Sequence, residues 1–242
     1  MPPAQRAVAA ARRDLRAVLW DLDGTLTDSV HLVVETMNSV IAAHDGPPLP
    51  YEKVGELIGL PLDAMFRLAW PDIGPDDVER YRIEYRTRYD AVAIPATRLY
   101  RGARTTLRDF HRAGMLQATV TGKRAADCER ILRGLGIKKD IDVYLGGDSV
   151  PRPKPAPDLA QFAMSRLGVS PEESVVIGDS AADLAMGKAA GAHTIQVLWG
   201  YSGSPLPDAD HSVRTWRELR DVVLALGAPK PGILGQRGPL RS

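Results

Sequence analysis

Two aspartates separated by one residue stand at the end of the first apolar run of the chain. They are Asp21 and Asp23 in the stretch WDLDGTLTDS, residues 20–29, and Gly24 and Thr25 follow them. Side chains two positions apart on a β-strand share a face, so both carboxylates can project to the same side. The pair is therefore either half of an active site or a turn, and Asp-Gly after a strand is by itself most often a turn.

Polar residues also follow three later apolar runs, and their chemistry fits one site. In chain order they are Thr121 with Gly122, Lys154, and Asp179 with Asp183. Each has a simple structural explanation, such as a helix cap, a charge that complements a helix dipole, or a solvated lysine. Together, acids, a hydroxyl and a lysine at successive strand ends predict a site for a hard cation beside a site for an anion.

The apolar runs that end in these residues alternate with helical patterns. The runs cover residues 16–20, 115–120, 141–145, 174–177 and 194–198. The helical patterns cover residues 105–113, 124–135, 157–167, 181–190 and 215–226. This alternation is typical of β-α-β units, and it predicts an α/β fold with a Rossmann-like parallel sheet.

Residues 28–94 interrupt the alternation. They contain helical patterns at 30–43, 62–68 and 76–90, separated by Pro and Gly, and no convincing strand. We expect an inserted all-helical cap domain at 28–94, placed over the carboxyl ends of the strands, where open α/β sheets bind ligands. The core domain would then comprise residues 16–27 and 95–227, with a flexible extension at 1–15 and a disordered tail at 228–242.

The composition limits the class of partner. Lys and Arg total 31 and Asp and Glu total 30, so the formal charge of +1 gives no reason to expect nucleic acid or an anionic membrane. No apolar run is long enough to span a bilayer. The single cysteine, Cys128, fits a reducing cytosol and an ordinary helix position. We expect a cytoplasmic protein with a small-molecule substrate, either a monomer or a homodimer.

The polar groups, in this order, resemble the four motifs of the haloacid dehalogenase-like (HAD) superfamily of hydrolases. The motifs are residues 21–25, Thr121, Lys154 and residues 178–183. The resemblance covers nearly the whole chain apart from its ends, and it is nearest to the phosphoglycolate phosphatase-like subfamily with a helical C1 cap. It implies a Mg²⁺-dependent phosphatase that hydrolyses a small phosphate monoester, phosphoglycolate-like or a sugar phosphate, through an aspartyl-phosphate intermediate.

The resemblance also implies a role for each residue. Asp21 would be the nucleophile, and Asp23 would protonate the leaving alcohol and then activate water. Thr121, the amide of Gly122 and Lys154 would bind the phosphoryl group. A dianionic phosphate approaches carboxylates only where positive charge cancels theirs, which Mg²⁺ and the lysine would supply. The Mg²⁺ ligands would be Asp21, the carbonyl of Asp23, Asp179 and, through water or hydrogen bonds, Asp183.

Substrate choice is expected to depend on the cap. The cap residues that we expect to face the substrate are Gly59, Leu60 and Arg67, although a single Arg is more often a solvated helix residue. Trp70 and the series Tyr81, Tyr85 and Tyr89 fall at helical spacing and indicate cap packing. Residues 199–201, Trp-Gly-Tyr, follow the last predicted strand and either line the edge of the site or pack as a loop.

Two other functions stay open. A β-phosphoglucomutase-like phosphoryl transfer uses the same core, but those mutases resemble one another in having an Arg shortly after the cap glycine, whereas Leu60, Pro61 and Leu62 follow Gly59 here. A non-catalytic phosphate-binding module is less expected, because the acids and the lysine are all present. One departure from the family pattern is Gly122, which stands where many members have Asn and removes an orienting side chain.

Overall fold

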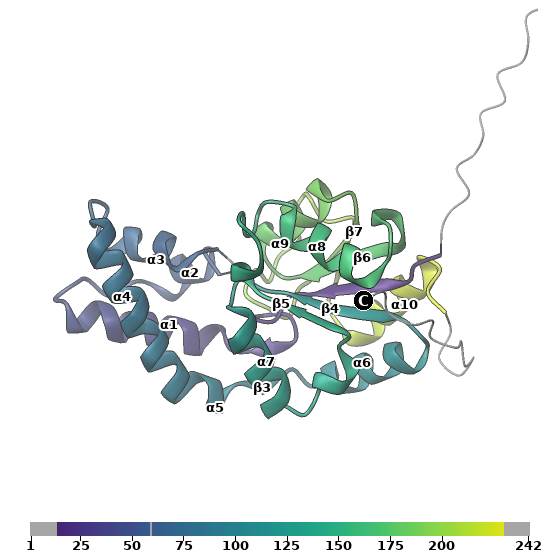
Figure 1. Cartoon of the computed structure of the whole chain (residues 1–242), viewed down its shortest axis with the longest axis horizontal. Coiled ribbons are helices and arrows are strands. Elements are labelled where there is room, and N and C mark those ends of the chain that lie inside the picture. The colour runs from purple at the N-terminus through teal and green to yellow at the C-terminus, as the bar shows by residue number, and fades with distance from the viewer. Residues whose placement is uncertain (1–13, 59, 230–242) are drawn as a thin grey trace, which may run out of the picture.

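The computed structural model describes residues 14–58 and 60–229. It has two parts, an α/β core and a helical cap, joined end to end (Figure 1). The predicted extension at 1–15 and tail at 228–242 lie outside the described residues except at their inner ends, where Leu15 and Ala228 are buried among core side chains. None of the helices in the described ranges has the length and apolarity needed to cross a membrane.

The core contains a six-stranded parallel sheet, which confirms the predicted α/β fold. Its order is β5 (Val143–Leu145), β4 (Leu116–Val120), β1 (Ala17–Trp20), β6 (Ser174–Gly178), β7 (His193–Val197) and β8 (His211–Val213). The register pairs Trp20 of β1 with Thr119 of β4 and Ile177 of β6. Residues that follow these three strands therefore meet at one edge of the sheet.

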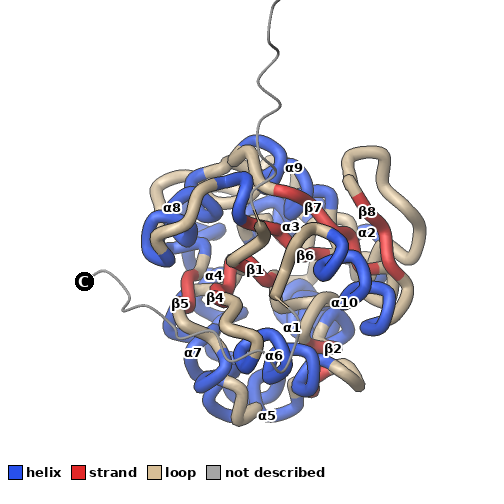
Figure 2. Tube along the Cα trace, turned by 90° about the vertical axis from the view of Figure 1, so that its right-hand side faces the viewer, coloured by secondary structure: helices blue, strands red, loops and turns tan. Residues whose placement is uncertain are grey.

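Helices cover both faces of the sheet (Figure 2). Alternate side chains of β1 point to opposite faces: Val18 and Trp20 join one apolar cluster, and Ala17 and Leu19 join another. The first cluster includes side chains of α6 (Ala103–Arg112), α7 (Ala125–Gly134) and α10 (Trp216–Ala225), and the second includes side chains of α8 (Asp158–Leu167) and α9 (Ala181–Ala189). Short 3-10 turns lie at Lys138–Asp140, Gly147–Ser149 and Pro171–Glu173.

The cap has an apolar core of its own. It consists of α1 (Val30–Ala43), α2 (Tyr51–Gly55), α3 (Leu62–Ala69), α4 (Pro75–Arg88), a π-helical turn (Tyr89–Ala93) and α5 (Ile94–Ala96). The first helix was predicted at the residues where it is observed. The predicted helix at 76–90 ends at Arg88 and continues as the π-helical turn, a local geometry that is frequent at functional sites.

The two chain crossings between core and cap pair with each other. Thr27–Asp28 (β2) and Arg98–Leu99 (β3) form a short antiparallel ribbon. No strand was expected here, because two-residue strands leave no periodic pattern in the sequence. The ribbon pairs the segment that enters the cap with the segment that leaves it. This pairing fixes the position at which the cap begins.

Candidate active site

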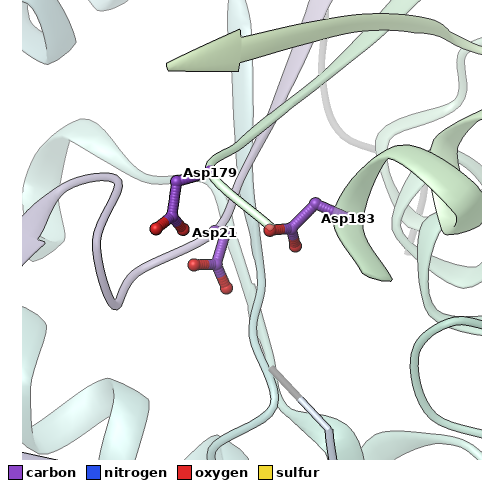
Figure 3. Close-up of side chains that lie close together, drawn as sticks. All are labelled: Asp21, Asp179 and Asp183. Carbon is purple, nitrogen blue, oxygen red and sulfur yellow. The ribbon is translucent and has the colours of Figure 1, made fainter. Parts of the chain in front are cut away.

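Three buried carboxylates meet at the carboxyl edge of the sheet. Asp21 follows β1, Asp179 follows β6, and Asp183 lies in the first turn of α9. One oxygen from each lies within 4.8 Å of the others, and the three side chains converge in Figure 3. The aligned ends of β1 and β6 bring these residues together, as the strand-end pattern predicted.

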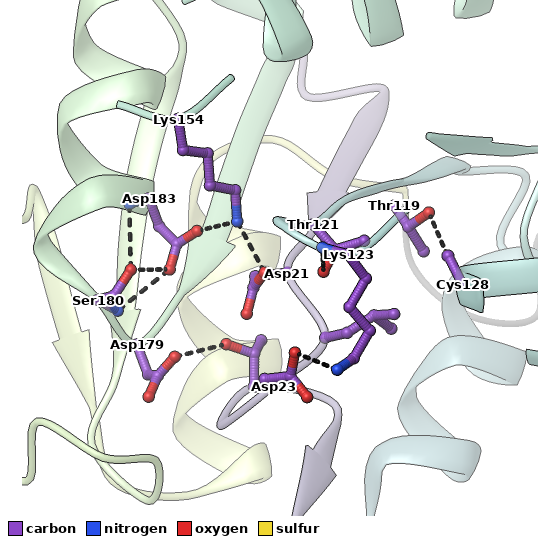
Figure 4. A network of polar contacts seen from close by, with 12 residues as sticks. Asp21, Asp23, Thr119, Thr121, Lys123, Cys128, Lys154, Asp179, Ser180 and Asp183 are labelled. Carbon is purple, nitrogen blue, oxygen red and sulfur yellow. Dashed lines mark hydrogen bonds and ion pairs between the residues drawn. The ribbon is translucent and has the colours of Figure 1, made fainter. Parts of the chain in front are cut away.

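Lys154 reaches the same cluster from the loop after β5. The side chain is buried, and its Nζ donates to Asp21 Oδ1 at 2.7 Å and also to the carboxylate of Asp183 (Figure 4). Burial alone would lower the pKa of this ammonium, but Asp183 and Asp21 raise it above its usual range. Lys154 is therefore a permanent positive charge among the carboxylates.

One lysine does not neutralise three carboxylates. Burial raises the pKa of Asp21 to about 7, against the opposing effect of Lys154 and with the help of Asp183 and Asp23. Burial, Asp21 and Asp183 likewise raise the pKa of Asp179 well above its usual value. A buried set of oxygen ligands with excess negative charge is what a hard divalent cation requires, so the residues present fit a metal site.

Glycines make room for this cluster. Gly24 has a φ of +81°, and a Cβ there would lie 2.2 Å from Asp179 Oδ2. A Cβ on Gly200 would lie 2.4 Å from the same oxygen. The neighbouring residue, Tyr201, donates its backbone N–H to that oxygen at 2.8 Å. The stretch at 199–201, whose role the sequence left open, therefore packs around Asp179.

Asp23 has a separate set of partners on the cap side. The Ser29 hydroxyl donates to its Oδ1, and Lys123 Nζ lies 3.0 Å from its Oδ2. Lys123 also donates to the Tyr89 hydroxyl at 2.7 Å. Burial would lower the pKa of Lys123, but Asp23 and the neighbouring tyrosines raise it well above its usual value. No role was predicted for Ser29 or Lys123, and only their closeness to the motifs could have indicated one.

The predicted phosphate-binding residues lie at the end of β4. Thr121 is buried beside Asp21 (Figure 4), and its Oγ1 accepts the backbone N–H of Lys123 at 3.3 Å. Gly122 lines the cavity described below. Cys128 lies behind this strand, with its sulfur 3.1 Å from the Thr119 hydroxyl, and burial raises the pKa of the thiol to about 12. Cys128 is therefore an ordinary packed residue, as expected.

A cavity of about 260 Å³ lies between the core and the cap. Its volume is close to the lower end of the range for small-molecule sites, roughly 300–1,000 Å³. Asp21, Asp23 and Gly122 line it from the core. The cap contributes apolar side chains from 33–65 and polar ones from 82–90, among which are Leu60, Arg82, Tyr85, Arg86 and Tyr89.

The three cap residues that we expected to face the substrate differ in where the structure places them. Leu60 lines the cavity. Gly59 lies outside the described residues. Arg67 is exposed and does not line the cavity, and within the described part of the chain its guanidinium reaches only the carbonyl of Ile73, at 3.5 Å. The solvated alternative for Arg67 therefore fits the structure, and the cavity takes its cap arginines from α4 instead.

The tyrosine series, which we expected to be cap packing, is divided. Tyr81 packs in the cap core against His44, Phe66 and Trp70. Tyr85 and Tyr89 are buried too, with their rings stacked at 5.6 Å between centroids, but both reach the cavity. The prediction of cap packing was therefore incomplete for Tyr85 and Tyr89, because both also line the cavity.

Comparisons with known proteins agree with this geometry. Residues 18–197 match the family model for haloacid dehalogenase-like hydrolases. The chain is 33% identical over 217 residues to N-acetylmuramic acid 6-phosphate phosphatase of Pseudomonas aeruginosa, covering 88% of this chain and 96% of that one. It is 31% identical over 186 residues to phosphoglycolate phosphatase of Xylella fastidiosa, covering 77% and 81%. The crystal structure of a predicted phosphoglycolate phosphatase from Haemophilus somnus has the same fold, with a TM-score of 0.78, 23% identity, and coverage of 86% of this chain and 97% of that one.

Proposed function

Because the chain belongs to the haloacid dehalogenase-like hydrolases, we propose that it hydrolyses a small phosphate monoester with Mg²⁺ and an aspartyl-phosphate intermediate. The protein is a phosphoric monoester hydrolase, and its relatives are phosphatases. The observation that carries the mechanism is the arrangement of Asp21 and Asp23. Both line one cavity, yet each is held by its own lysine, Lys154 for the first and Lys123 for the second.

In the first step, an oxygen of Asp21 attacks phosphorus. The ester P–O bond breaks, and Asp23 gives a proton to the leaving alcohol. In the second step, Asp23 takes a proton from water as that water attacks phosphorus. The acyl-phosphate P–O bond then breaks, which releases inorganic phosphate and restores the Asp21 carboxylate. The Ser29 hydroxyl and the Lys123 ammonium fix the orientation of Asp23 for both transfers.

The residues around Asp21 prepare it for a dianionic substrate. Lys154 offsets part of the negative charge of Asp21. Thr121 and the Gly122 amide would bind the phosphoryl oxygens. Asp21, Asp179, Asp183 and the Asp23 carbonyl would hold Mg²⁺, which supplies positive charge to the transferring phosphoryl group. Without that cation, the three carboxylates would repel the substrate.

The test is phosphate release from a panel of esters, measured with Mg²⁺ and with EDTA. The names of the relatives place phosphoglycolate and N-acetylmuramic acid 6-phosphate first in that panel, followed by sugar phosphates and p-nitrophenyl phosphate. We expect hydrolysis that requires Mg²⁺. Conversion of β-glucose 1-phosphate to glucose 6-phosphate, with little phosphate released, would favour the mutase alternative. A folded protein that binds Mg²⁺ and turns over no ester would contradict the proposal.

A further inference from the structure

The cavity has a second charged region on the side of the cap. It is formed by one face of α4 and its π-helical extension, where residues 82, 85, 86, 89 and 90 recur at helical spacing and all line the cavity. Across from this face, the start of α7 and the loop before it contribute Lys123, Arg124 and Asp127. Four cations and several acids therefore face one small volume.

Most of these charges already have a partner. Arg82 pairs with Asp63 at 2.5 Å and Glu79 at 2.6 Å, and Arg124 binds both oxygens of Asp127, at 2.7 and 2.9 Å. Of the other lining charges, Lys123 pairs with Asp23, and Asp90 pairs with Arg130. Asp21 pairs with Lys154, and Asp148 accepts the backbone N–H of Ala125.

Arg86 is the one charged residue among the described lining residues that has no partner. Within residues 14–58 and 60–229, its guanidinium forms no ion pair and no hydrogen bond, although the side chain is half-buried. Burial and the positive charges of Arg124 and Arg82 lower its pKa, against the weaker effects of Glu79 and Asp127. A guanidinium kept in a half-buried, electropositive place without a counter-ion is a ready binding group for an anion.

We propose that Arg86 binds a carboxylate of the same substrate whose phosphate lies at Asp21, so the natural substrate is the phosphate ester of a hydroxy acid. This inference rests on the proposed phosphatase function. The apolar side chains of Ile58, Leu60 and Met65, on the other cap wall, would contact the carbon skeleton between the two charged groups. The substrate would thus be held at both ends, with its reacting phosphate at the core and its carboxylate at the cap.

A carboxylate fits this place better than a second phosphate does. A single guanidinium can bind a carboxylate through two parallel N–H donors and match its single charge. A phosphate dianion would need further cations, but Arg82 and Arg124 are committed to Asp63 and Asp127. Asp90 and Asp148, which also line the cavity, would repel the extra charge.

Matched pairs of substrates test the inference. 3-Phosphoglycerate and glycerol 3-phosphate differ only in a carboxylate against a hydroxymethyl group, and N-acetylmuramic acid 6-phosphate carries a carboxylate that N-acetylglucosamine 6-phosphate lacks. We expect the wild-type protein to favour the carboxylate member of at least one pair by tenfold or more in kcat/KM. In Arg86→Gln that ratio should fall towards one, mainly because KM rises for the carboxylate member, and Arg86→Lys should recover part of it.

Arg67→Gln is the matched control. It removes the same charge from another cap helix, at an exposed residue that does not line the cavity, so the ratio should stay at the wild-type value. Thermal unfolding of each variant shows whether the fold is intact. An unchanged ratio in folded Arg86→Gln would overturn the inference while leaving the phosphatase function in place.

Two further outcomes would also overturn it. Preference for fructose 1,6-bisphosphate over fructose 6-phosphate that is lost in Arg86→Gln, with no preference in the carboxylate pairs, would assign the site to a second phosphate. Absence of Mg²⁺-dependent hydrolysis of every ester, p-nitrophenyl phosphate included, would refute the proposed function itself and the inference that depends on it.

Discussion

Asp21 belongs to two environments at once. One side of it joins the buried oxygen cluster with Asp179 and Asp183, and the other side lines the cavity. A nucleophile needs a face that the substrate can reach, and a metal ligand needs a fixed geometry. The position directly after a central strand gives Asp21 both, because the strand fixes the backbone while the side chain, although buried, lines the cavity.

Replacement of Asp21 by Asn tests its role as nucleophile. The amide has almost the same shape and still offers an oxygen to Lys154, so we expect a folded protein. Turnover should fall by roughly 10³-fold or more, because an amide does not form the phosphorylated intermediate. Steady-state phosphate release and thermal unfolding measure the two effects. Activity near the wild-type level would contradict the assignment.

A substitution at Gly200 tests whether the space left by the glycines around Asp179 is needed for metal binding. In Gly200→Ala the new methyl group would lie 2.3 Å from the Gly24 carbonyl oxygen and 2.4 Å from Asp179 Oδ2, so the turn at Gly24 and the carboxylate both have to move. We expect Mg²⁺ affinity to fall by roughly 10–100-fold, as for other changes in groups that orient a ligand. Titration of activity with Mg²⁺ provides the measurement. Gly134→Ala is the control, because a Cβ there meets no described atom outside its own helix within 4 Å.

At the scale of the elements, the long helices and the central strands could be predicted, and the shortest elements could not. The helix at 30–43 carries four turns of apolar periodicity, and the central strands β1 and β6 are nearly continuous apolar runs. By contrast, β8 has a single buried residue, and β2 and β3 have two residues each. Elements this short owe their geometry to neighbours in space, which leave no local pattern.

The cap side of the site was less predictable for a related reason. Arg67 and Arg86 both occupy cap helices, and nothing in the sequence tells which of them faces the core. That depends on how α4 packs against α1 and α3 and on the π-helical turn at 89–93. The core residues were predictable because a strand end fixes its place in the sheet, whereas a helix face is fixed only by packing.

Contact between the cap and the core is tested at Gly55. A Cβ on Gly55 would lie 1.8 Å from the ring of Tyr201, so α2 can approach the core loop only because this residue has no side chain. In Gly55→Ala the two parts should separate, and kcat/KM should fall by about tenfold, since small displacements of a positioned substrate are costly.

Steady-state kinetics and circular dichroism distinguish this effect from unfolding. The control is Gly74→Ala, which makes the same change in another part of the cap. There the added methyl group meets no atom of the described residues within 4 Å, its chain neighbours apart. The helical signal should be unchanged in both variants. Equal kinetics in the two variants would show that the Gly55 contact has no role in catalysis.

At the scale of the whole molecule, the site lowers the stability of the fold that carries it. Asp21 and Asp179 have folded-state pKa values above their ordinary values, so the folded state binds protons more tightly than the unfolded state does. The unfolded carboxyls lose their protons first as the pH rises. The stability of the metal-free protein should therefore fall between about pH 4 and pH 7. A bound cation would restore it.

Asp179→Asn tests this relation. Among the described residues, no lysine forms an ion pair with Asp179. Its Oδ2 accepts the Tyr201 N–H and its Oδ1 accepts the Thr25 hydroxyl. In Asn the amide oxygen can take the place of Oδ2, and the amide NH2 can donate to the Thr25 hydroxyl oxygen. In EDTA at pH 8 we expect the Tm of Asp179→Asn to exceed the wild-type value by about 3 °C or more. From pH 5 to pH 8 the Tm of the variant should decline less than that of the wild-type protein. Phosphatase activity should be lost in the same variant. A lower Tm than wild type at pH 8 would contradict the electrostatic account.

Tyr201 contacts the two parts of the molecule at once. Its backbone N–H donates to Asp179, and its hydroxyl donates to the carbonyl of Glu52 in α2. Binding free energies at two linked sites are reciprocal: if a cation at Asp179 favours the position of the cap, then a substrate that closes the cap must tighten the cation by the same factor. The apparent Mg²⁺ affinity of this protein would then depend on the concentration of its substrate.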